Sequence, residues 1–265
     1  MRTGGIRKEH ALLVRSTPWG ERDRLVVVFG ERAGRTLAKA VSALEVGSRM
    51  APLLVPPALG EFTLAAGRSG IPVLAGVELE ERFPRWRRSA GTLEAAGILL
   101  SVLDGMEAPE EQNRTMFTLA LEVLRAGPGD EPLATVSVFL AGALELLGLS
   151  SAEDTCSICA KKLGGGAAAA AADLSAFYCA DCFNREYGRS HVDALTISAE
   201  RLRQLSRLRQ TPPAKAGQAG FSEADIAFVL NLAMHRMGDM LPQASAALRK
   251  AATERASASP FLQRS

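Results

Sequence analysis

The chain has 265 residues and 47% apolar side chains, enough for two or three folded units with cores of their own. No apolar run reaches the roughly 20 uninterrupted residues that a membrane helix needs, so we expect no membrane segment. The net charge is only +2, but residues 1–50 hold ten Lys or Arg against five acids, and residues 191–265 hold ten against six. Residues 82–150 hold six against nine. Basic ends around an acidic middle permit contact with nucleic acid.

The first part of the chain has the pattern of short β-strands. Turn signals at Pro18-Trp19-Gly20 and at Gly34 separate apolar or alternating runs. These runs lie at residues 10–15, 24–30, 36–41, 52–55, 60–65 and 71–79. Five or six strands without a long helix among them predict a small barrel. A barrel of this size should bury Phe29 and Phe62, which leaves Trp19 as either an exposed stacking platform or a lid.

The pattern becomes helical after Pro84. An apolar stripe predicts a helix over residues 92–106, and Asn113 is the predicted N-cap of a helix that includes residues 116–125. Pro132 is expected to begin a third helix and Gly148 to end it.

Further helices are predicted towards the end of the chain. One contains Leu202, Leu205 and Leu208, and Ser222 opens another in the pattern Ser222-Glu-Ala-Asp225. Between them, residues 211–220 are rich in Pro and Gly and are interpreted as an exposed linker.

The four cysteines of the chain form two pairs, Cys156-x-x-Cys159 and Cys179-x-x-Cys182. Each pair brings two sulfurs together from a tight turn, and two pairs complete the tetrahedron that a structural Zn²⁺ prefers. Because four thiolates leave no position for water, the predicted zinc site supports structure and does no chemistry. The Gly- and Ala-rich segment 164–172 between the pairs is assigned no function.

Two other roles for the cysteines are less well supported. A redox dithiol needs only one Cys-x-x-Cys motif, beside a βαβ unit. Two disulfides require an oxidising compartment, but residues 1–8 contain no apolar segment of the kind that directs export. We therefore expect reduced thiols in the cytoplasm.

The order of these parts, with several local motifs, resembles the bacterial RecO family of recombination mediators. The motifs are Val14-Arg15, the turn Pro18-Trp19-Gly20-Glu21-Arg22-Asp23-Arg24, the turn Glu31-Arg32-Ala33-Gly34-Arg35, and Leu144-Glu145-Leu146-Leu147-Gly148 ahead of Cys156. The resemblance implies an α+β protein: an OB-fold nucleic-acid-binding barrel at 1–81, then a helical domain at 82–265 with a zinc ribbon inserted at 152–190.

The resemblance also implies a function in DNA repair without enzymatic turnover. Members anneal single strands and, with RecR, help to load RecA onto single-stranded DNA that is covered by single-strand-binding protein. The expected partners are single- and double-stranded DNA, RecR, single-strand-binding protein and, indirectly, RecA, in the cytoplasm and associated with the nucleoid. The three histidines lie far apart in sequence and no nucleophile motif is present, which also argues against an enzyme.

Phosphate contacts are expected from basic residues of the first three strands and their turns. The predicted DNA-binding residues are Arg15, Arg22, Arg24, Arg35, Lys39 and Arg49. In the resembling family the segment after the third strand is a strongly basic loop, whereas residues 40–50 here keep Arg49 alone and add Glu45. The basic function can instead lie at residues 85–88 or 201–209. An adaptor of the same fold with weaker DNA binding is the alternative function.

Overall fold

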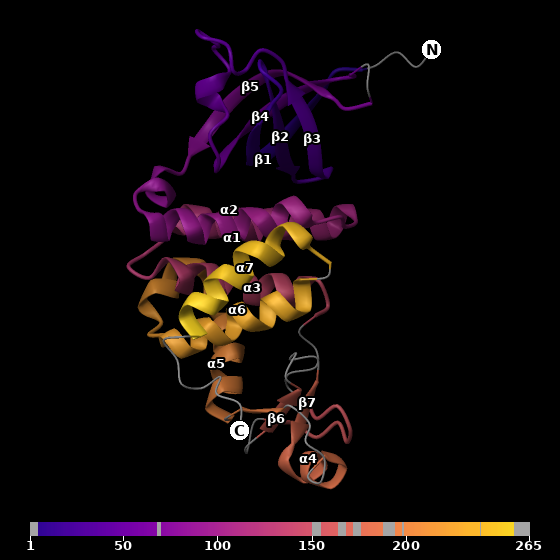
Figure 1. Cartoon of the computed structure of the whole chain (residues 1–265), viewed down its shortest axis with the longest axis vertical. Coiled ribbons are helices and arrows are strands. Elements are labelled where there is room, and N and C mark those ends of the chain that lie inside the picture. The colour runs from indigo at the N-terminus through magenta and orange to yellow at the C-terminus, as the bar shows by residue number, and fades with distance from the viewer. Residues whose placement is uncertain are drawn as a thin grey trace. The chain divides into compact units, whose positions relative to one another are not determined.

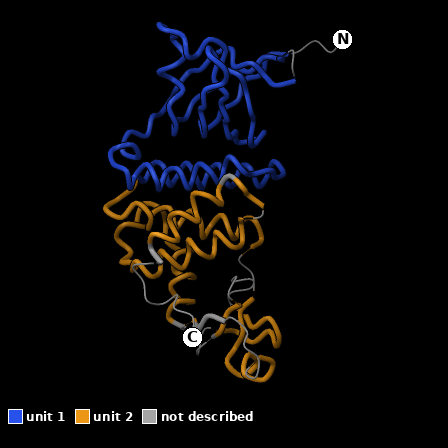
Figure 2. The backbone as a smooth tube through the Cα atoms, viewed as in Figure 1, with its two compact units in different colours: residues 1–127 blue, residues 128–265 orange. Residues whose placement is uncertain are grey.

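The computed structural model describes residues 5–67, 70–149, 155–163, 168–171, 176–187, 194–197, 199–238 and 240–256 (Figure 1). The chain divides into two compact units, residues 1–127 and residues 128–265 (Figure 2). Strands give way to helices near residue 82, where the sequence places a domain boundary, but the first two helices belong to the same compact unit as the strands. No helix in the described part of the chain is long and apolar enough to span a bilayer.

Five strands close into a barrel in the order β1-β2-β3-β5-β4. β1 pairs with β4 antiparallel to close it, and β3 pairs with β5 in parallel. The strands are β1 (Arg7–Trp19), β2 (Asp23–Gly30), β3 (Gly34–Ala40), β4 (Ala58–Ala65) and β5 (Val73–Arg82). This arrangement is that of an OB-fold barrel. The predicted fold class, an N-terminal OB barrel followed by helices with a four-cysteine insertion, is confirmed.

Alternate residues of every strand fill the barrel interior. The core includes Val26 and Val28 of β2, Ala38 and Ala40 of β3, and Phe62 of β4. Small alanines opposite larger side chains allow a barrel of this size to close without a cavity at its centre. Phe62 is fully buried, as predicted.

The first two strands are also buried on their outer faces. Leu12, Val27 and Phe29 are nearly or fully inaccessible to solvent although they alternate with the core residues. Helices α1 (Ala90–Gly105) and α2 (Glu110–Ala126) supply the cover, since both contact strands of the barrel. Part of the barrel surface on which phosphate contacts were expected is therefore covered by protein.

The two helices begin in different ways. Ser89 caps α1 in a reciprocal capping box with Thr92. The predicted N-cap of α2 at Asn113 is wrong, because the helix begins at Glu110. Asn113 is buried inside the first turn, where its Nδ2 donates to the carbonyl of Ala108 at 2.9 Å.

A 3-10 helix, η2 (Pro84–Arg87), connects the barrel to α1. Its Trp86 is fully buried and donates from Nε1 to the carbonyl of Leu124 at 2.9 Å. This anchor fixes the arginines on either side of Trp86 near the end of β5.

The second unit contains helices that pack around α3 (Pro132–Leu146), which begins at Pro132 as predicted. The other elements are α5 (Ala199–Gln210), η3 (Pro213–Gln218), α6 (Glu223–Met237) and α7 (Pro242–Ala256). Ser222 caps α6 with Asp225 as predicted. The prediction of an exposed linker at 211–220 is wrong in part, because η3 packs against α3 and buries Ala216.

Candidate metal centre and nucleic-acid interface

The four cysteine sulfurs converge on one point. All four Sγ atoms lie within 4.8 Å of one another, and those of Cys159 and Cys179 are 3.9 Å apart. A Zn²⁺ ion held tetrahedrally by thiolates at about 2.3 Å requires sulfurs about 3.8 Å apart. Four sulfur donors at this spacing fit a metal ion in both chemistry and geometry, so the structure brings together all four predicted ligands.

The first pair lies in a tight turn closed by the backbone. Thr155 and Lys162 form an isolated β-bridge, and between them the N–H of Cys156 donates to the carbonyl of Lys161 at 2.8 Å. The N–H of Ala160 in turn donates to the carbonyl of Cys156 at 2.8 Å. Ala160 adopts φ +57°, a left-handed conformation that favours glycine. The chain thus accepts backbone strain to direct both sulfurs inward.

The second pair is placed by a strand and a helix. β7 (Phe177–Cys179) ends at Cys179, and α4 (Ala180–Tyr187) carries Cys182 in its first turn. β7 pairs with β6 (Ala168–Ala171), which also pairs with β8 (Ala194–Ile197). The predicted bounds of the insertion, at residues 152 and 190, and part of the segment 164–172 lie outside the described residues.

The thiols affect one another's ionisation. Burial raises the pKa of Cys156, but backbone hydrogen bonds from Cys159, Cys179 and Ile158 outweigh it and lower the value to about 6. Burial raises the pKa of Cys182 to about 12, together with hydrogen bonds to the other three thiols. Cys156 therefore ionises readily, whereas Cys182 resists ionisation in the absence of a cation. A cation at the centre would favour the thiolate form of its ligands.

Cationic groups lie beside the cluster. Arg185 of α4 places Nη2 3.6 Å from the sulfur of Cys182 and can donate to it. Lys161 and Lys162 are exposed on the first turn. Because four thiolates around a divalent cation carry a net negative charge, these groups stabilise the loaded form.

Two of the predicted DNA-binding residues converge on a buried carboxylate. Arg15 of β1 donates from Nε to Oδ2 of Asp104 at 2.6 Å, and Arg35 of β3 donates from Nε to Oδ1 at 3.1 Å. The Asp104 side chain is only 5% exposed. Because a buried carboxylate without a partner is costly, these two arginines hold the barrel against α1. Asp104 was not among the predicted site residues. Its one signal in the sequence is an acidic residue among the apolar residues of a helix.

Two further cations pair with carboxylates near the surface. Lys39 Nζ lies 2.6 Å from Oδ2 of Asp23, and Arg22 pairs with Glu45. The hydrogen bond from Lys39, and next the backbone N–H of Ser42, hold the pKa of Asp23 below its usual value. The first pair joins β3 to the start of β2, and the second joins the β1–β2 turn to the loop that follows β3. A phosphate must therefore compete with these acids for the cations.

The remaining two predicted residues differ in exposure. Arg24 is half-buried, and its Nη1 donates to Ser16 Oγ at 3.3 Å. Arg49 is exposed and forms no ion pair within the described part of the chain. The structure therefore places the six predicted residues on one unit but in four environments, and it brings only some of them together.

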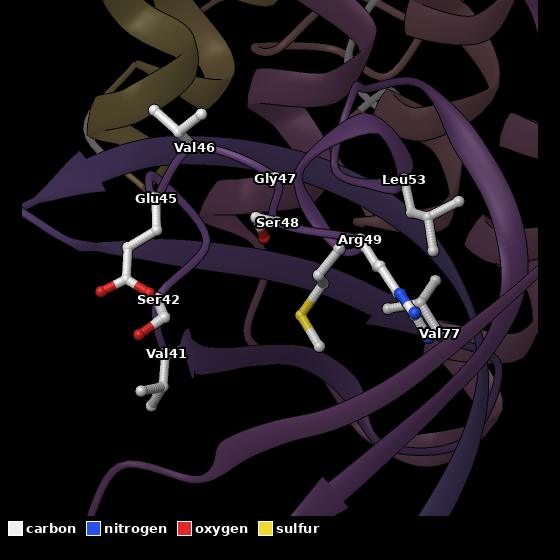
Figure 3. A pocket seen from close by; sticks show the side chains of 10 residues that line it. Val41, Ser42, Glu45, Val46, Gly47, Ser48, Arg49, Leu53 and Val77 are labelled. Carbon is white, nitrogen blue, oxygen red and sulfur yellow. The ribbon is translucent and has the colours of Figure 1, made fainter.

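Arg49 borders a shallow depression of about 420 Å³ on the barrel (Figure 3). Its lining comes mainly from the loop between β3 and β4, with Val77 of β5 on one side. Figure 3 shows Glu45 and Ser42 on the arm of the loop opposite Arg49 and Leu53. Val41 and Val46 of this loop are exposed. The lining of the depression thus combines apolar side chains with two serines, the acid Glu45 and one cation, Arg49, that forms no ion pair among the described residues.

Comparison with known proteins places the chain in a family. Residues 87–232 match the model of the C-terminal part of recombination protein O, RecO. A DNA repair protein RecO of Desulforamulus reducens is 27% identical over 234 residues, 85% of this chain and 90% of that protein. The DNA repair protein RecO of Moorella thermoacetica is 24% identical over 189 residues, which are 71% of this chain and 70% of that protein. The DNA repair protein RecO of Listeria monocytogenes serotype 4b is 25% identical over 207 residues, 77% of this chain and 80% of that protein. The chain belongs to the RecO family of DNA repair proteins.

Proposed function

We propose that the chain is a non-enzymatic recombination mediator that binds DNA. It anneals complementary single strands and, together with RecR, helps to load RecA onto single-stranded DNA covered by single-strand-binding protein. The observation that carries this proposal is a closed OB-type barrel with basic turns at the start of a RecO-family chain. These tasks require binding and release of strands, not bond making.

Phosphate binding is assigned to cations that are exposed or partly exposed on the barrel. Arg22, Arg24, Lys39 and Arg49 can neutralise phosphates and release counterions, so affinity should fall steeply with salt. Arg15 and Arg35 also keep their predicted role in this proposal, although their contacts with Asp104 give them a structural role as well. Because Glu45 and Asp23 occupy two of the cations, DNA must open these pairs as it binds.

Binding of a fluorescent single-stranded oligonucleotide at several salt concentrations tests this proposal. We expect a steep negative slope of log affinity against log salt, and a smaller slope for the triple variant Arg22→Ala, Arg24→Ala, Lys39→Ala. Arg114→Ala is the control, because it removes an exposed charge that pairs with Glu110 and Glu31. Binding that does not depend on salt, or equal behaviour of both variants, would refute the assignment.

A second test removes the carboxylate that competes with phosphate for Arg22. Glu45→Gln keeps the side-chain size but removes the charge that pairs with Arg22. We expect a several-fold higher affinity for single-stranded DNA at low salt, and a difference that shrinks as salt screens the charges. An unchanged affinity would mean that Arg22 does not contact DNA.

An adaptor function is the second candidate. The loop after β3 favours it, because Val41, Leu44 and Val46 are exposed at the position where the RecO family usually has a basic loop. Exposed apolar side chains grouped on one loop are typical of a protein-binding surface. Co-purification of RecR or single-strand-binding protein with the wild type but not with a Val41→Ser, Val46→Ser variant, without any effect on DNA affinity, would favour the adaptor.

For the four-cysteine cluster we propose Zn²⁺ in a structural role. The ligands would be Cys156, Cys159, Cys179 and Cys182. The ion would supply the positive charge that four thiolates need, and the residues themselves leave no open coordination position. Elemental analysis of purified protein tests this directly: about one zinc per chain is expected, and cobalt substitution should give the spectrum of a tetrahedral thiolate site.

A further inference from the structure

Two arginines at the end of the barrel lack acidic partners. Arg82 ends β5 and Arg87 ends η2. Within the described residues neither side chain pairs with a carboxylate, in contrast to Arg15, Arg22 and Arg35. An arginine without a counterion at the surface has its charge available for a ligand.

Both side chains are held in place by the loop between β3 and β4. Arg82 Nη1 donates to the carbonyl of Pro52 at 3.1 Å, and Arg87 Nη1 donates to the carbonyl of Val55 at 3.3 Å. Each guanidinium keeps several N–H donors beyond the one used. These contacts restrict the side chains in advance, so that less conformational freedom is lost when a ligand binds.

The two guanidinium groups lie near enough to affect each other. Partial burial lowers the pKa of Arg87, and the positive charge of Arg82 lowers it further. Like charges brought together without a counterion are unfavourable, and a bound anion relieves the repulsion.

The same loop connects this pair to Arg49. Pro52 lies in the 3-10 helix η1 (Ala51–Leu53), and Leu53 lines the depression beside Arg49 (Figure 3). Arg49 thus begins the short segment 49–55, Arg82 contacts its middle at Pro52, and Arg87 contacts its end at Val55. We call Arg49, Arg82 and Arg87 the arginine track.

We infer that Arg82 and Arg87 form a phosphate-binding site for single-stranded DNA that continues the path of the strand from Arg49. The inference rests on the proposed function and extends it to residues outside the first three strands. The depression beside Arg49 has Val46, Leu53 and Val77 in its lining and suits an unstacked base of a single strand, whereas the bases of a duplex remain stacked within the duplex. Arg82 and Arg87 supply positive charge beside the loop after β3, in which Arg49 is the one cation.

The competing explanation is structural. Arg82 and Arg87 satisfy two loop carbonyls, and this alone could account for their positions. Glutamine distinguishes the two roles because its amide can still donate a hydrogen bond to a carbonyl but carries no charge. A purely structural role therefore predicts unchanged DNA binding for Arg→Gln variants, since only the charge is lost.

The test is anisotropy of a labelled oligo-dT with the full-length protein at several salt concentrations. The double variant R82Q/R87Q should bind more weakly, and its log–log salt slope should fall by about 1.4, since each phosphate contact to a single strand contributes about 0.7. The control R114Q removes one exposed charge from α2 of the same unit and should keep the wild-type slope. Melting curves check that both variants are folded.

The outcomes separate the two proposals. Salt-dependent binding by the wild type, lost in part by R82Q/R87Q but not by R114Q, supports the phosphate site. Salt-dependent binding that R82Q/R87Q leaves at the wild-type slope overturns this inference and leaves the proposed function intact. Absence of salt-dependent binding by the wild type overturns the proposed function.

Discussion

The barrel and the four-cysteine insertion obtain their stability in different ways. All five strands of the barrel contribute side chains to one apolar core, from Ala11 in β1 to Leu74 in β5. The described strands of the insertion have three or four residues each, and their buried side chains include Phe177 and Ala170. Such short strands cannot bury enough surface to offset the entropy of ordering the chain. The barrel thus depends on packing, whereas the insertion would depend on the proposed metal centre at its four sulfurs.

The largest expected effect comes from breaking the sulfur cluster. On the proposed zinc centre, Cys182→Ser should release the metal and unfold the insertion, because structural zinc contributes about 10 kcal/mol or more to folding such modules. Hydrogen exchange should show loss of protection at residues 155–187 and an unchanged barrel. Asn184→Ser, on the exposed side of α4, is the control. A variant that melts like its parent and retains zinc would contradict the dependence on the four sulfurs.

The matching change in the barrel acts on packing alone. Phe62→Ala removes a fully buried ring and should destabilise the first unit by about 3–5 kcal/mol, while zinc content stays the same. Both tryptophans, Trp19 and Trp86, lie in this unit, so urea unfolding followed by tryptophan fluorescence reports on it. The exposed Val46→Ala is the control. Loss of zinc in Phe62→Ala would mean that the two regions are not independent.

A smaller effect distinguishes an arginine that pairs with a buried carboxylate from one that pairs with an exposed carboxylate. Arg15→Gln weakens a charged hydrogen bond to the buried Asp104 and should cost about 1–3 kcal/mol of unfolding free energy. Arg22→Gln breaks only an exposed pair and should change stability by less than about 1 kcal/mol. The same urea titration measures both. Equal stabilities would show that Asp104 does not need Arg15.

The smallest expected effect is a gain in the stability of the insertion. Ala160 adopts a left-handed conformation that costs a residue with a Cβ about 1 kcal/mol relative to glycine. Ala160→Gly should therefore stabilise the insertion by about that amount, visible as slower hydrogen exchange near Cys156. Ala180→Gly, at the start of α4, is the control and should bring no gain. A loss of protection in Ala160→Gly would show that the backbone strain at this turn is not relieved.

Features determined by short-range pattern could be predicted from the sequence. The Cys-x-x-Cys spacing predicted the convergence of the sulfurs, and the strand runs with their turn residues predicted the barrel. The Ser222 cap of α6 was also predicted, because a capping box spans only four residues. The start of α2 was not, since burial of Asn113 overrides its preference for a cap.

Long-range pairing limited the prediction of the nucleic-acid interface. The partner of Arg15 lies 89 residues away in sequence, and that of Arg35 lies 69 residues away. Nothing local distinguishes an arginine that will meet a buried carboxylate from one that will stay free. The availability of Arg82 and Arg87 likewise depends on how the β3–β4 loop folds.

The insertion interrupts the helical unit between two helices that contact each other, α3 and α5. To bring them together, the unfolded chain must close a long loop, and the entropy lost grows with the logarithm of loop length. A metal that joins Cys156 to Cys182 removes roughly half of that loop from the closure, which is worth about 0.6 kcal/mol. Metal binding should thus also speed docking of α5 onto α3, because it shortens the loop that must close during folding.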